Sequence, residues 1–450
     1  MLRLRRILAA TTLAVTVLAG VAAPSFARHS QEAGLIARAP GASPGYTLFA
    51  PEERNQTYLV DLDGEVAHRW RHGTPPGNFQ YLLEDGSLLR AGDFDLENRY
   101  LQGKGAGGRI ERLGWDSEVL WRFDYNTDKH RQHHDVEPLP NGNVMFIAWE
   151  HKTAEEALAA GRDPGLLSRG ELWPDTIIEV DPTTDEIVWE WHVFDHLIQD
   201  RDPTKANFGV VAEHPEKINL NFTLGTSGAH DWNHTNSVDY NAALDQIVVS
   251  VRQFSEIWII DHATTTEAAR GPAGDLMFRY GNPATHDRGG PEEQQLFAQH
   301  DAQWIPEGLP GAGSILVLSN GQRDIREWSS VEEVVPALDG RTYRRGLDGS
   351  FIAAATRVYG NEDSQRFFGF NTSGSQRQAN GNTLITDGPH GRVFEVTETG
   401  EIIWDYVNPY FDGEGHGHGV SAAGFETDAW RMFRAERYAP TYPGLERLRP

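Results

Sequence analysis

The stretch Thr176-Ile-Ile-Glu-Val180, Asp181 to Asp185 and Ile187-Val-Trp-Glu-Trp191 decides the fold of this chain. It has the pattern of an apolar strand, a short polar turn and a second strand rich in aromatic residues. The same pattern recurs at 58–70, 109–123, 257–280 and 392–406. Its recurrence predicts that each copy is the outer hairpin of a repeated all-β unit.

Most of these outer hairpins follow an inner hairpin that opens on polar residues. The inner hairpins run from Phe79 to Leu89, His133 to Trp149, His234 to Val251, His300 to Leu318 and Ser375 to Thr386. Turns such as Asp85-Gly86 and Asn141-Gly142 supply the positive φ angles that a tight hairpin needs. Four strands per unit, in units of roughly fifty residues or more, predict the blades of a β-propeller.

The two ends of the chain supply one further blade. Five units are complete, whereas Tyr46 to Arg71 offers only an outer pair of strands and Val420 to Tyr438 only an inner pair. Joining the two gives an all-β, six-bladed propeller closed by its N- and C-terminal strands, which leaves no free sheet edge. The outer strands of the fourth blade are expected within Ser330 to Tyr359, although no clear Val/Trp pattern marks them.

Composition agrees with one propeller domain over residues 43–450. The 46 glycines, 24 prolines and 13 tryptophans suit many turns and large aromatic contacts between blades. Helix is expected only as a short insertion in the second blade, at Ala154 to Ala160. The stretch from Asp195 to Ala229 has little periodicity and is expected to run over one face.

The N-terminal residues have the pattern of a secretion signal. Three arginines precede an apolar run from Ile7 to Ala23, and Ser25-Phe-Ala27 offers a small-residue cleavage site. This predicts a signal peptide over 1–27, a flexible leader over 28–42 and export to the periplasm or the medium. An uncleaved anchor is disfavoured, because the run is shorter than the ~20 apolar residues of a membrane span. The Sec and Tat export routes both stay open.

The absence of cysteine and the charge of the chain exclude several functions. Without cysteine there is no thiol catalysis and no thiolate metal site. The chain carries 40 Lys and Arg against 65 Asp and Glu, a net charge of −25. Nucleic acid is therefore disfavoured as a partner, because a strongly acidic protein repels it. An anionic substrate needs a local pocket of positive charge.

Histidines open the inner hairpins of three blades and are the natural candidates for such a pocket. His133 or His134, His234 and His300 occupy equivalent positions in successive blades. Because inner strands begin at one rim of the channel, these side chains are expected to converge. Imidazole titrates near neutrality and is a good nucleophile, so the cluster suggests anion binding, metal binding, or acid/base and nucleophilic chemistry. Alternatively, each histidine caps its own strand through hydrogen bonds.

Further polar residues surround these positions. Arg323 is predicted to clamp an oxyanion, because guanidinium presents a planar fork of donors, although a simple pair with Asp324 is the alternative. Arg252, at the end of the third blade's inner hairpin, is a second candidate. Substrate contacts are expected from His133, Asn236, Arg252, Asp301 and Asn320.

Several motifs together resemble one family, the bacterial arylsulfate sulfotransferases. The core of the resemblance is Asp231-Trp-Asn-His-Thr-Asn-Ser-Val-Asp-Tyr240, followed by Ile247 to Arg252 and Glu256 to Asp261. Other similar segments are Gln299 to Gln303, Leu318 to Gly321 with Arg323, Asn380 to Ile385, and Phe433 to Tyr438. The resemblance extends from Tyr46 to the C-terminus and implies an exported six-bladed propeller.

The resemblance also implies a reaction. A sulfuryl group passes from an aryl sulfate to a phenolic acceptor through a sulfated histidine, with no nucleotide donor, cofactor or metal. His234, His300 and Arg323 match positions that bind the sulfuryl group, and His134 is expected to act with them. The fifth blade opens on Ser375-Gln376 instead of histidine, so the nucleophile stays open among His134, His300, His390, His416 and His418.

Two other functional classes remain possible from the residues alone. One is a non-catalytic exported propeller that binds a ligand or partner at its rim, since fold does not fix function. The other is a metal-dependent hydrolase or lyase that uses His134, His234 and His300 as ligands, with Asp135 or Asp301 nearby. Observation of sulfuryl exchange between phenols would exclude the non-catalytic propeller, and activity in the presence of a chelator would exclude the metal-dependent enzyme. The identities of donor and acceptor, and a homodimeric state, stay open.

Overall fold

Short polar turns close the inner hairpins, as the sequence predicts. In the second blade, Oδ1 of Asn141 accepts a hydrogen bond from the backbone N–H of Asn143, and Gly142 has a φ of 90°. The segments 85–87 and 380–382 repeat this arrangement. Glycine adopts such a positive φ without steric cost, so the turn fixes the register of the two strands.

The computed structural model describes residues 33–52, 54–94, 101–224, 230–363, 367–410, 419–420, 426–427 and 431–449. The predicted signal peptide and the pair His416 and His418 lie outside these residues. From Ala33 onward, the described chain is one unit built on six antiparallel sheets of at least four strands. The expected all-β, six-bladed propeller is confirmed.

The first three blades follow one another along the chain, each from the channel outward. The first contains β5 (Pro76–Leu82), β6 (Leu88–Asp93), β7 (Gly108–Leu113) and β8 (Val119–Asp124). The second contains β9 (His130–Pro138), β10 (Val144–Glu150), β13 (Asp175–Asp181) and β14 (Glu186–His192). The third contains β17 (Thr235–Asn241), β18 (Gln246–Val251), β19 (Glu256–Asp261) and β20 (Phe278–Tyr280).

The other three blades complete the ring. The fourth contains β21 (His300–Trp304), β22 (Ile315–Ser319), β23 (Ser330–Pro336) and β26 (Ala353–Tyr359), so its outer strands lie where they were expected. The fifth contains β27 (Gly374–Arg377), β28 (Thr383–Asp387), β29 (Arg392–Val396) and β30 (Ile402–Val407). The closing blade contains β33 (Met432–Tyr438), β2 (Tyr46–Pro51), β3 (Gln56–Val60) and β4 (Val66–Arg71).

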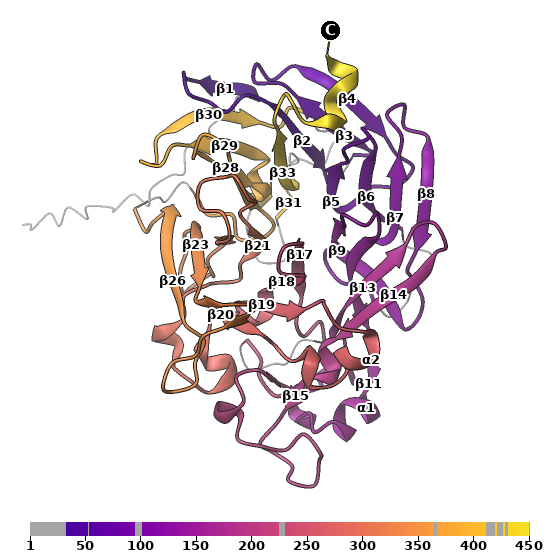
Figure 1. The fold of residues 1–450 in the computed structure, drawn as a ribbon, viewed down its shortest axis with the longest axis vertical. Coiled ribbons are helices and arrows are strands. Elements are labelled where there is room, and N and C mark those ends of the chain that lie inside the picture. The colour runs from indigo at the N-terminus through magenta and orange to yellow at the C-terminus, as the bar shows by residue number, and fades with distance from the viewer. Residues whose placement is uncertain are drawn as a thin grey trace, which may run out of the picture. The chain divides into compact units, whose positions relative to one another are not determined.

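The closing blade joins the two ends of the unit, as predicted. Strand β33 pairs antiparallel with β2, with Tyr438 opposite Tyr46 and Ala435 opposite Phe49. Figure 1 shows β5, β9, β17, β21 and β33 around the centre of the unit, with the later strands of each blade outside them. The starts of the inner strands therefore face one another across a channel.

Apolar side chains hold neighbouring blades together. Each of the six interfaces between adjacent blades carries its own cluster of buried side chains. Trp191 of the second blade, for example, shares a cluster with Trp258 of the third, and both are at most 2% exposed. Burial of such large aromatic surfaces supplies the main driving force for blade packing.

The segment expected as a flexible leader, 28–42, is instead structured from Gly34. Strand β1 (Gly34–Arg38) pairs antiparallel with β30 and adds a fifth strand to the fifth blade. The carbonyl of Gly41 then accepts hydrogen bonds from Asn380 and Asn382. The correction has a simple cause: unpaired backbone groups on the outer edge of β30 accept another strand.

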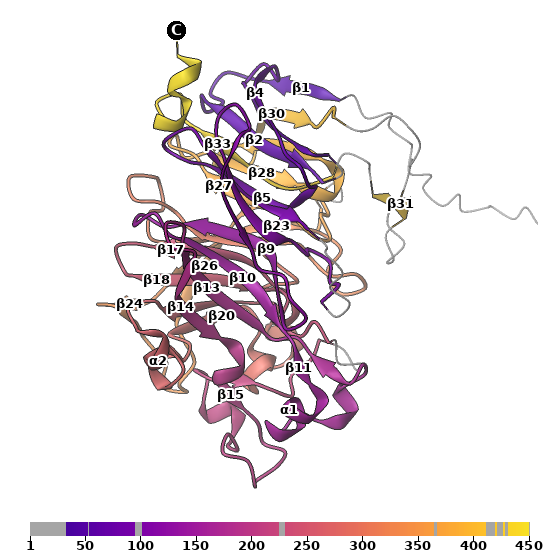
Figure 2. The same ribbon diagram turned by 90° about the vertical axis from the view of Figure 1, so that its right-hand side faces the viewer.

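The short insertions lie outside the blades. Helix α1 (Ala154–Ala159) follows the predicted insertion, and Thr153 and Glu156 form a capping box at its start. Figure 2 shows α1, β11 and β15 together at the end of the unit away from β1 and β4. The other short elements are β11 (Lys152–Thr153), β12 (Glu171–Leu172), β15 (Leu197–Ile198), β16 (Ile218–Asn219), α2 (Thr266–Ala269), β24 (Leu338–Asp339), β25 (Thr342–Tyr343), β31 (Gly419–Val420) and β32 (Glu426–Thr427).

Nine 3₁₀ turns occur in the described chain, at Pro164–Leu166, Val193–Asp195, Val211–Glu213, Arg252–Phe254, Pro272–Gly274, Pro283–His286, Pro291–Glu293, Gly388–His390 and Pro443–Leu448. The excursion from Asp195 to residue 224 contains only 3₁₀ turns and the two-residue strands β15 and β16, in line with its lack of periodicity. Within the described part of the chain, no helix has the length and apolar character that crossing a membrane requires.

Candidate active site

Irregular backbone at the start of the inner strands aims side chains into the channel. His134, His234 and Asp301 have φ angles of 54°, 52° and 56°, in the left-handed region. The pairing of β9 with β10 and of β21 with β22 shifts register at these points. Non-glycine residues rarely adopt this conformation, and bulges of this kind gather at functional sites. The recurrence in three blades marks this rim as the candidate active site.

Four of the predicted residues come together there. The ring centroids of His134 and His234 lie 4.6 Å apart. Phe433 lies 6.1 Å from the His134 ring and 6.2 Å from the His300 ring, so its side chain is shared between them. The backbone N–H of Arg252 donates to the carbonyl oxygen of His234 over 3.2 Å. His134, His234, His300 and Arg252 thus converge from the second, third and fourth blades.

The surroundings of His134 and His300 favour neutral imidazoles at these two positions. Burial, followed by the neighbouring His234, His133, His300 and Arg252, holds the pKa of His134 well below its ordinary value. Burial, followed by the charge of Arg252, does the same to the pKa of His300. At neutral pH both rings therefore carry a lone pair on one nitrogen, which a nucleophile or a base requires.

His134 contacts the ring of His133, its neighbour in sequence. Its Nδ1 lies 2.7 Å from Nδ1 of His133, and the His133 ring stacks on Trp149 at 4.1 Å. Nε2 of His133 in turn lies 3.2 Å from Oδ1 of Asp175. On its other side the His134 ring lies against Gly105, where an added Cβ would come within 2.2 Å of the ring. His133, predicted as a substrate contact, is fully buried between Trp149 and His134.

His234 is oriented by a carboxylate. Its Nδ1 lies 2.5 Å from Oδ2 of Asp231, and Oδ1 of Asp231 accepts a hydrogen bond from Nε1 of Trp149 over 2.9 Å. Burial raises the pKa of Asp231, but the charge and hydrogen bond of His234 outweigh it and hold that pKa below its ordinary value. Nε2 of His234 has no hydrogen-bond partner among the described residues.

His300 differs, because both of its ring nitrogens are engaged. Nδ1 lies 2.7 Å from Oδ1 of Asn320, and Nε2 accepts a hydrogen bond from the backbone N–H of Thr372 over 3.2 Å. The amide nitrogen of Asn320 donates to two backbone carbonyls, of Gly369 and Thr372, which fixes the amide orientation. Asn320 therefore positions His300, and the Nδ1 of His300 is the donor.

The guanidinium beside the histidines belongs to Arg252. Arg252 is partly buried, and among the described residues its side chain has no hydrogen-bond or ion-pair partner. Asp231 is the one carboxylate that acts on its pKa, which burial lowers. Arg323, by contrast, is exposed in the loop between β22 and β23. Of the two predicted clamps, Arg252 is the one that acts electrostatically on His134 and His300.

Asn236 and Asp301 are engaged in contacts between blades. The side-chain amide of Asn236 donates to the carbonyl of Gln299, just before His300. The carboxylate of Asp301 accepts hydrogen bonds from Arg434 over 2.8 Å and from the backbone N–H of Ser375 over 2.8 Å. The sequence predicts both as substrate contacts. Both carboxylate oxygens of Asp301 are bonded within the protein, whereas Oδ1 of Asn236 is buried and has no hydrogen-bond partner among the described residues.

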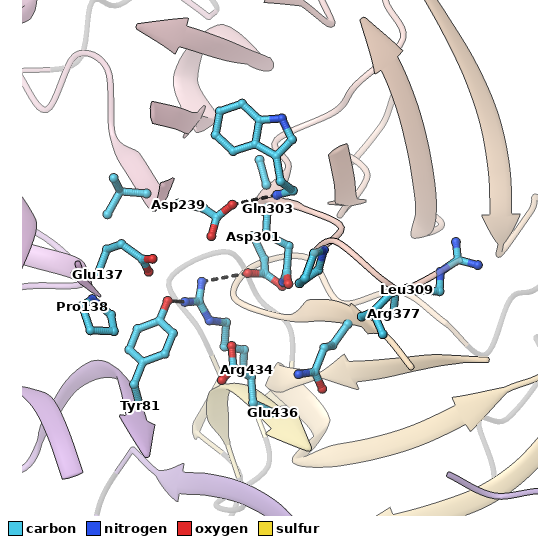
Figure 3. Close-up of a pocket in the computed structure, with 15 residues that line it drawn as sticks. Tyr81, Glu137, Pro138, Asp239, Asp301, Gln303, Leu309, Arg377, Arg434 and Glu436 are labelled. Carbon is cyan, nitrogen blue, oxygen red and sulfur yellow. Dashed lines mark hydrogen bonds and ion pairs between the residues drawn. The ribbon is translucent and has the colours of Figure 1, made fainter. Parts of the chain in front are cut away.

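Arg434 lies among buried acidic side chains. Its guanidinium also donates to Asp135 and to the hydroxyl of Tyr81, so it ties together residues that follow His134 and His300 in sequence. Arg434, Tyr81 and Asp301 line a cavity of about 220 Å³, and Figure 3 shows their side chains on its wall. Burial raises the pKa of Asp239 and of Glu436 to about 7 there.

Sequence reasoning assigned no role to Asp175, Asp231 or Arg434. Asp231 lies three residues before His234, so the motif itself carries a signal for it. Arg434 lies within the motif Phe433 to Tyr438. Asp175 reaches His133 from another strand, 42 positions away, and has no local signal. Among the residues that the structure describes, no three His, Asp or Glu side chains form a group suited to a metal ion.

Comparison with known proteins identifies the family. The model of the arylsulfotransferase (ASST) family matches residues 46–409. The chain belongs to the arylsulfotransferase family. Curated proteins gave no significant match to this member of the family.

Solved structures resemble this arylsulfotransferase-family protein only distantly. A Bacteroides caccae protein of unknown function is 12% identical, with a TM-score of 0.44, covering 87% of this chain and 98% of its own. Virginiamycin B lyase from Staphylococcus aureus is 10% identical, with a TM-score of 0.38 and coverages of 86% and 92%. The β-propeller domain of Cps50 (Swd1) from Myceliophteria thermophila is 11% identical, with a TM-score of 0.41 and coverages of 84% and 91%.

Proposed function

We propose that this protein transfers a sulfuryl group from an aryl sulfate to a phenolic acceptor, through a histidine of the cluster and without a nucleotide donor. Membership of the arylsulfotransferase family supports the reaction class. One observation carries the proposal. Arg252, a guanidinium without a partner among the described residues, belongs to the same cluster as His134 and His234, whose Nε2 atoms also have no partner there.

The chemistry follows from these groups. A guanidinium fork matches the oxygens of a sulfate ester and stabilises charge that develops on them in the transition state. A neutral imidazole nitrogen attacks sulfur, the S–O bond to the aryl group breaks, and the phenolate leaves as an N–S bond forms. In the second half, an acceptor phenol gives up its proton, its oxygen attacks sulfur and the N–S bond breaks. Such a cycle gives ping-pong kinetics.

The proposed surroundings of the reaction follow from the sequence. The signal-like segment 1–27 supports export to the periplasm or the medium. The net charge of −25 argues against nucleic acid as a partner. Arg252 supplies the local positive charge by which an anionic donor enters an acidic protein.

Turnover of a chromogenic aryl sulfate tests the proposal. Purified protein is incubated with 4-nitrophenyl sulfate in chelator, with and without an added phenol, and nitrophenol and the new sulfate ester are measured separately. We expect nitrophenol release that accelerates with phenol and matches the amount of ester formed. Release that needs a metal ion would support the hydrolase alternative. Ligand binding without any turnover would support a non-catalytic propeller.

A further inference from the structure

The rings of His133 and His134, which are adjacent in sequence, contact each other because the backbone of His134 has an unusual conformation. Neighbouring residues of a strand normally project to opposite faces of the sheet. In the middle of β9 the left-handed φ of His134, 54°, breaks that alternation. Nδ1 of His133 and Nδ1 of His134 consequently lie 2.7 Å apart. One of these two nitrogens must donate and the other must accept, because both cannot carry a proton in a hydrogen bond.

Asp175 decides which nitrogen donates. Its Oδ1 lies 3.2 Å from Nε2 of His133, a close contact without the geometry of a hydrogen bond, and neither atom has a hydrogen-bond partner in the described structure. Its Oδ2 accepts the backbone N–H of Thr235 over 2.7 Å, which fixes the carboxylate in place. Both side chains are at most 1% exposed, so no bulk water competes for them. A buried carboxylate stabilises a proton on the nitrogen that faces it.

The proton positions then follow along the chain of groups. His133 carries its proton on Nε2, towards Asp175, and accepts at Nδ1. His134 therefore carries its proton on Nδ1 and donates it to His133. The lone pair of His134 lies on Nε2, which has no partner among the described residues. Asp175 and His133 thus leave the lone pair of His134 on Nε2, the ring nitrogen that lies beside Gly105.

We propose that Asp175 and His133 are positioning residues that hold His134 in its Nδ1–H tautomer and so make Nε2 of His134 the nitrogen that accepts the sulfuryl group. This assignment rests on the proposed function. The alternative nucleophile His300 uses both nitrogens for contacts to Asn320 and Thr372. His234 instead has a carboxylate directly on Nδ1, an arrangement suited to holding a proton.

Asp175, His133 and His134 form a chain along which a proton can move, called the relay below. The relay balances charge during the first half of the reaction. As Nε2 of His134 forms its bond to sulfur, its Nδ1 proton moves to Nδ1 of His133. The resulting imidazolium of His133 is compensated by the carboxylate of Asp175. When the acceptor takes the sulfuryl group, the proton returns to Nδ1 of His134. His234, with Asp231 behind it, takes the proton of the acceptor phenol and returns it to the departing phenolate in the next cycle.

Asp175→Asn is the sharpest test, because it reverses the relay without removing a side chain. The Oδ1 of asparagine keeps the bond from Thr235, and its NH₂ group then donates to Nε2 of His133. The proton of His133 moves to Nδ1, and that of His134 is forced onto Nε2, where it blocks attack. We expect the burst of nitrophenol from 4-nitrophenyl sulfate to slow by about 10²–10⁴-fold, with KM little changed.

Asp231→Asn is the matched control, because it makes the same substitution in the neighbouring carboxylate–histidine pair of Asp231 and His234. Nitrophenolate leaves readily without a proton, so this variant should keep the burst and lose rate only in transfer to the acceptor. His133→Phe is a second test of the relay, because it retains an aromatic ring against Trp149 but removes the acceptor of the His134 proton. We expect it to slow the burst as Asp175→Asn does.

Two readouts identify the nitrogen and the residue directly. ¹⁵N NMR of histidine-labelled protein should show Nδ1–H at His134 in the wild type and Nε2–H in Asp175→Asn. Mass spectrometry under non-acidic conditions, after treatment with donor alone, should find the sulfate on His134. Sulfation of another histidine, or a wild-type burst in Asp175→Asn, would overturn the relay. Absence of any sulfohistidine in the wild type would instead refute the proposed function.

Discussion

A guanidinium without a partner among the described residues is the residue-scale feature on which the proposed reaction depends. Burial of an unpaired cation is unfavourable, and Arg252 retains that cost in the described structure next to three imidazoles. An anion that arrives at this point removes the cost and gains a planar fork of donors. Arg323, which the family resemblance favoured, lies exposed, where solvent weakens its attraction for an anion.

The two arginines can be separated by substitution. Arg252→Met should lower kcat/KM for 4-nitrophenyl sulfate by about 10²-fold, because a charge-stabilising donor at the transferring group is lost. Arg252→Lys should recover only part of this, since a point charge does not reproduce the fork. Arg323→Met serves as the control and should stay near wild type. The assignment is wrong if Arg323→Met is the variant with the large loss.

The sequence predicted residues well where a strand sets their direction, and less well elsewhere. His134, His234 and His300 open equivalent strands, so their convergence followed from the repeat alone. Arg323 lies in a loop, whose path the repeat does not determine. Asp175 belongs to an outer strand, and its contact with His133 depends on a bulge that no short motif marks. Strand β1 is mostly exposed, so it lacked the alternating pattern that reveals other strands.

At the scale of the element, the bulged start of an inner strand works only with its neighbouring loop. The carbonyl of Gly105 accepts the backbone N–H of His134 over 2.8 Å, and the imidazole packs where a Cβ would otherwise lie. Gly105 also has a φ of 83°, so two separate constraints select glycine there. The strand and the loop together determine where Nε2 of His134 lies.

Gly105→Ala tests the placement of this ring. The new methyl group would come 2.2 Å from Cε1 of His134, which forces the ring to move. We expect kcat to fall by about 10²-fold, because displacing a reacting group by an ångström has an effect of that size. Gly142→Ala is the matched control: its φ is 90°, but its Cβ meets nothing within 4 Å. Both variants should lose about 1–2 kcal/mol of stability from backbone strain, so only activity separates them.

At the scale of the whole unit, ring closure keeps the inner strands in place around the channel. The closing blade combines β33 from one end of the chain with β2 from the other. It packs on the first blade through one apolar cluster and on the fifth through another. The hairpin repeat and the two half-blades were enough to predict this closure. The polar contacts that support it were not predictable, because no short motif marks them and several, such as Arg437 to Thr47 and Ser43 to Glu395, join residues 390 and 352 positions apart.

A buried ion pair between Arg437 of the closing blade and Glu395 of the fifth offers a test of that closure. Both side chains are 0% exposed. Arg437 also donates to Thr47, and Glu395 also accepts the backbone N–H of Ser43 over 2.8 Å. Removing one partner leaves the other charge buried and uncompensated, an effect typically worth about 3–5 kcal/mol.

Arg437→Met should therefore lower the free energy of unfolding in urea by about 3–5 kcal/mol. The double variant Arg437→Met, Glu395→Met should lose less than the sum of the two single variants, because it leaves no lone buried charge. Arg38→Met is the control, since the Arg38–Asp63 pair spans the same two blades but is 41% and 69% exposed. Its loss should stay below about 1 kcal/mol. Equal losses at the buried and exposed pairs would mean that β-strand pairing and apolar packing alone close the ring.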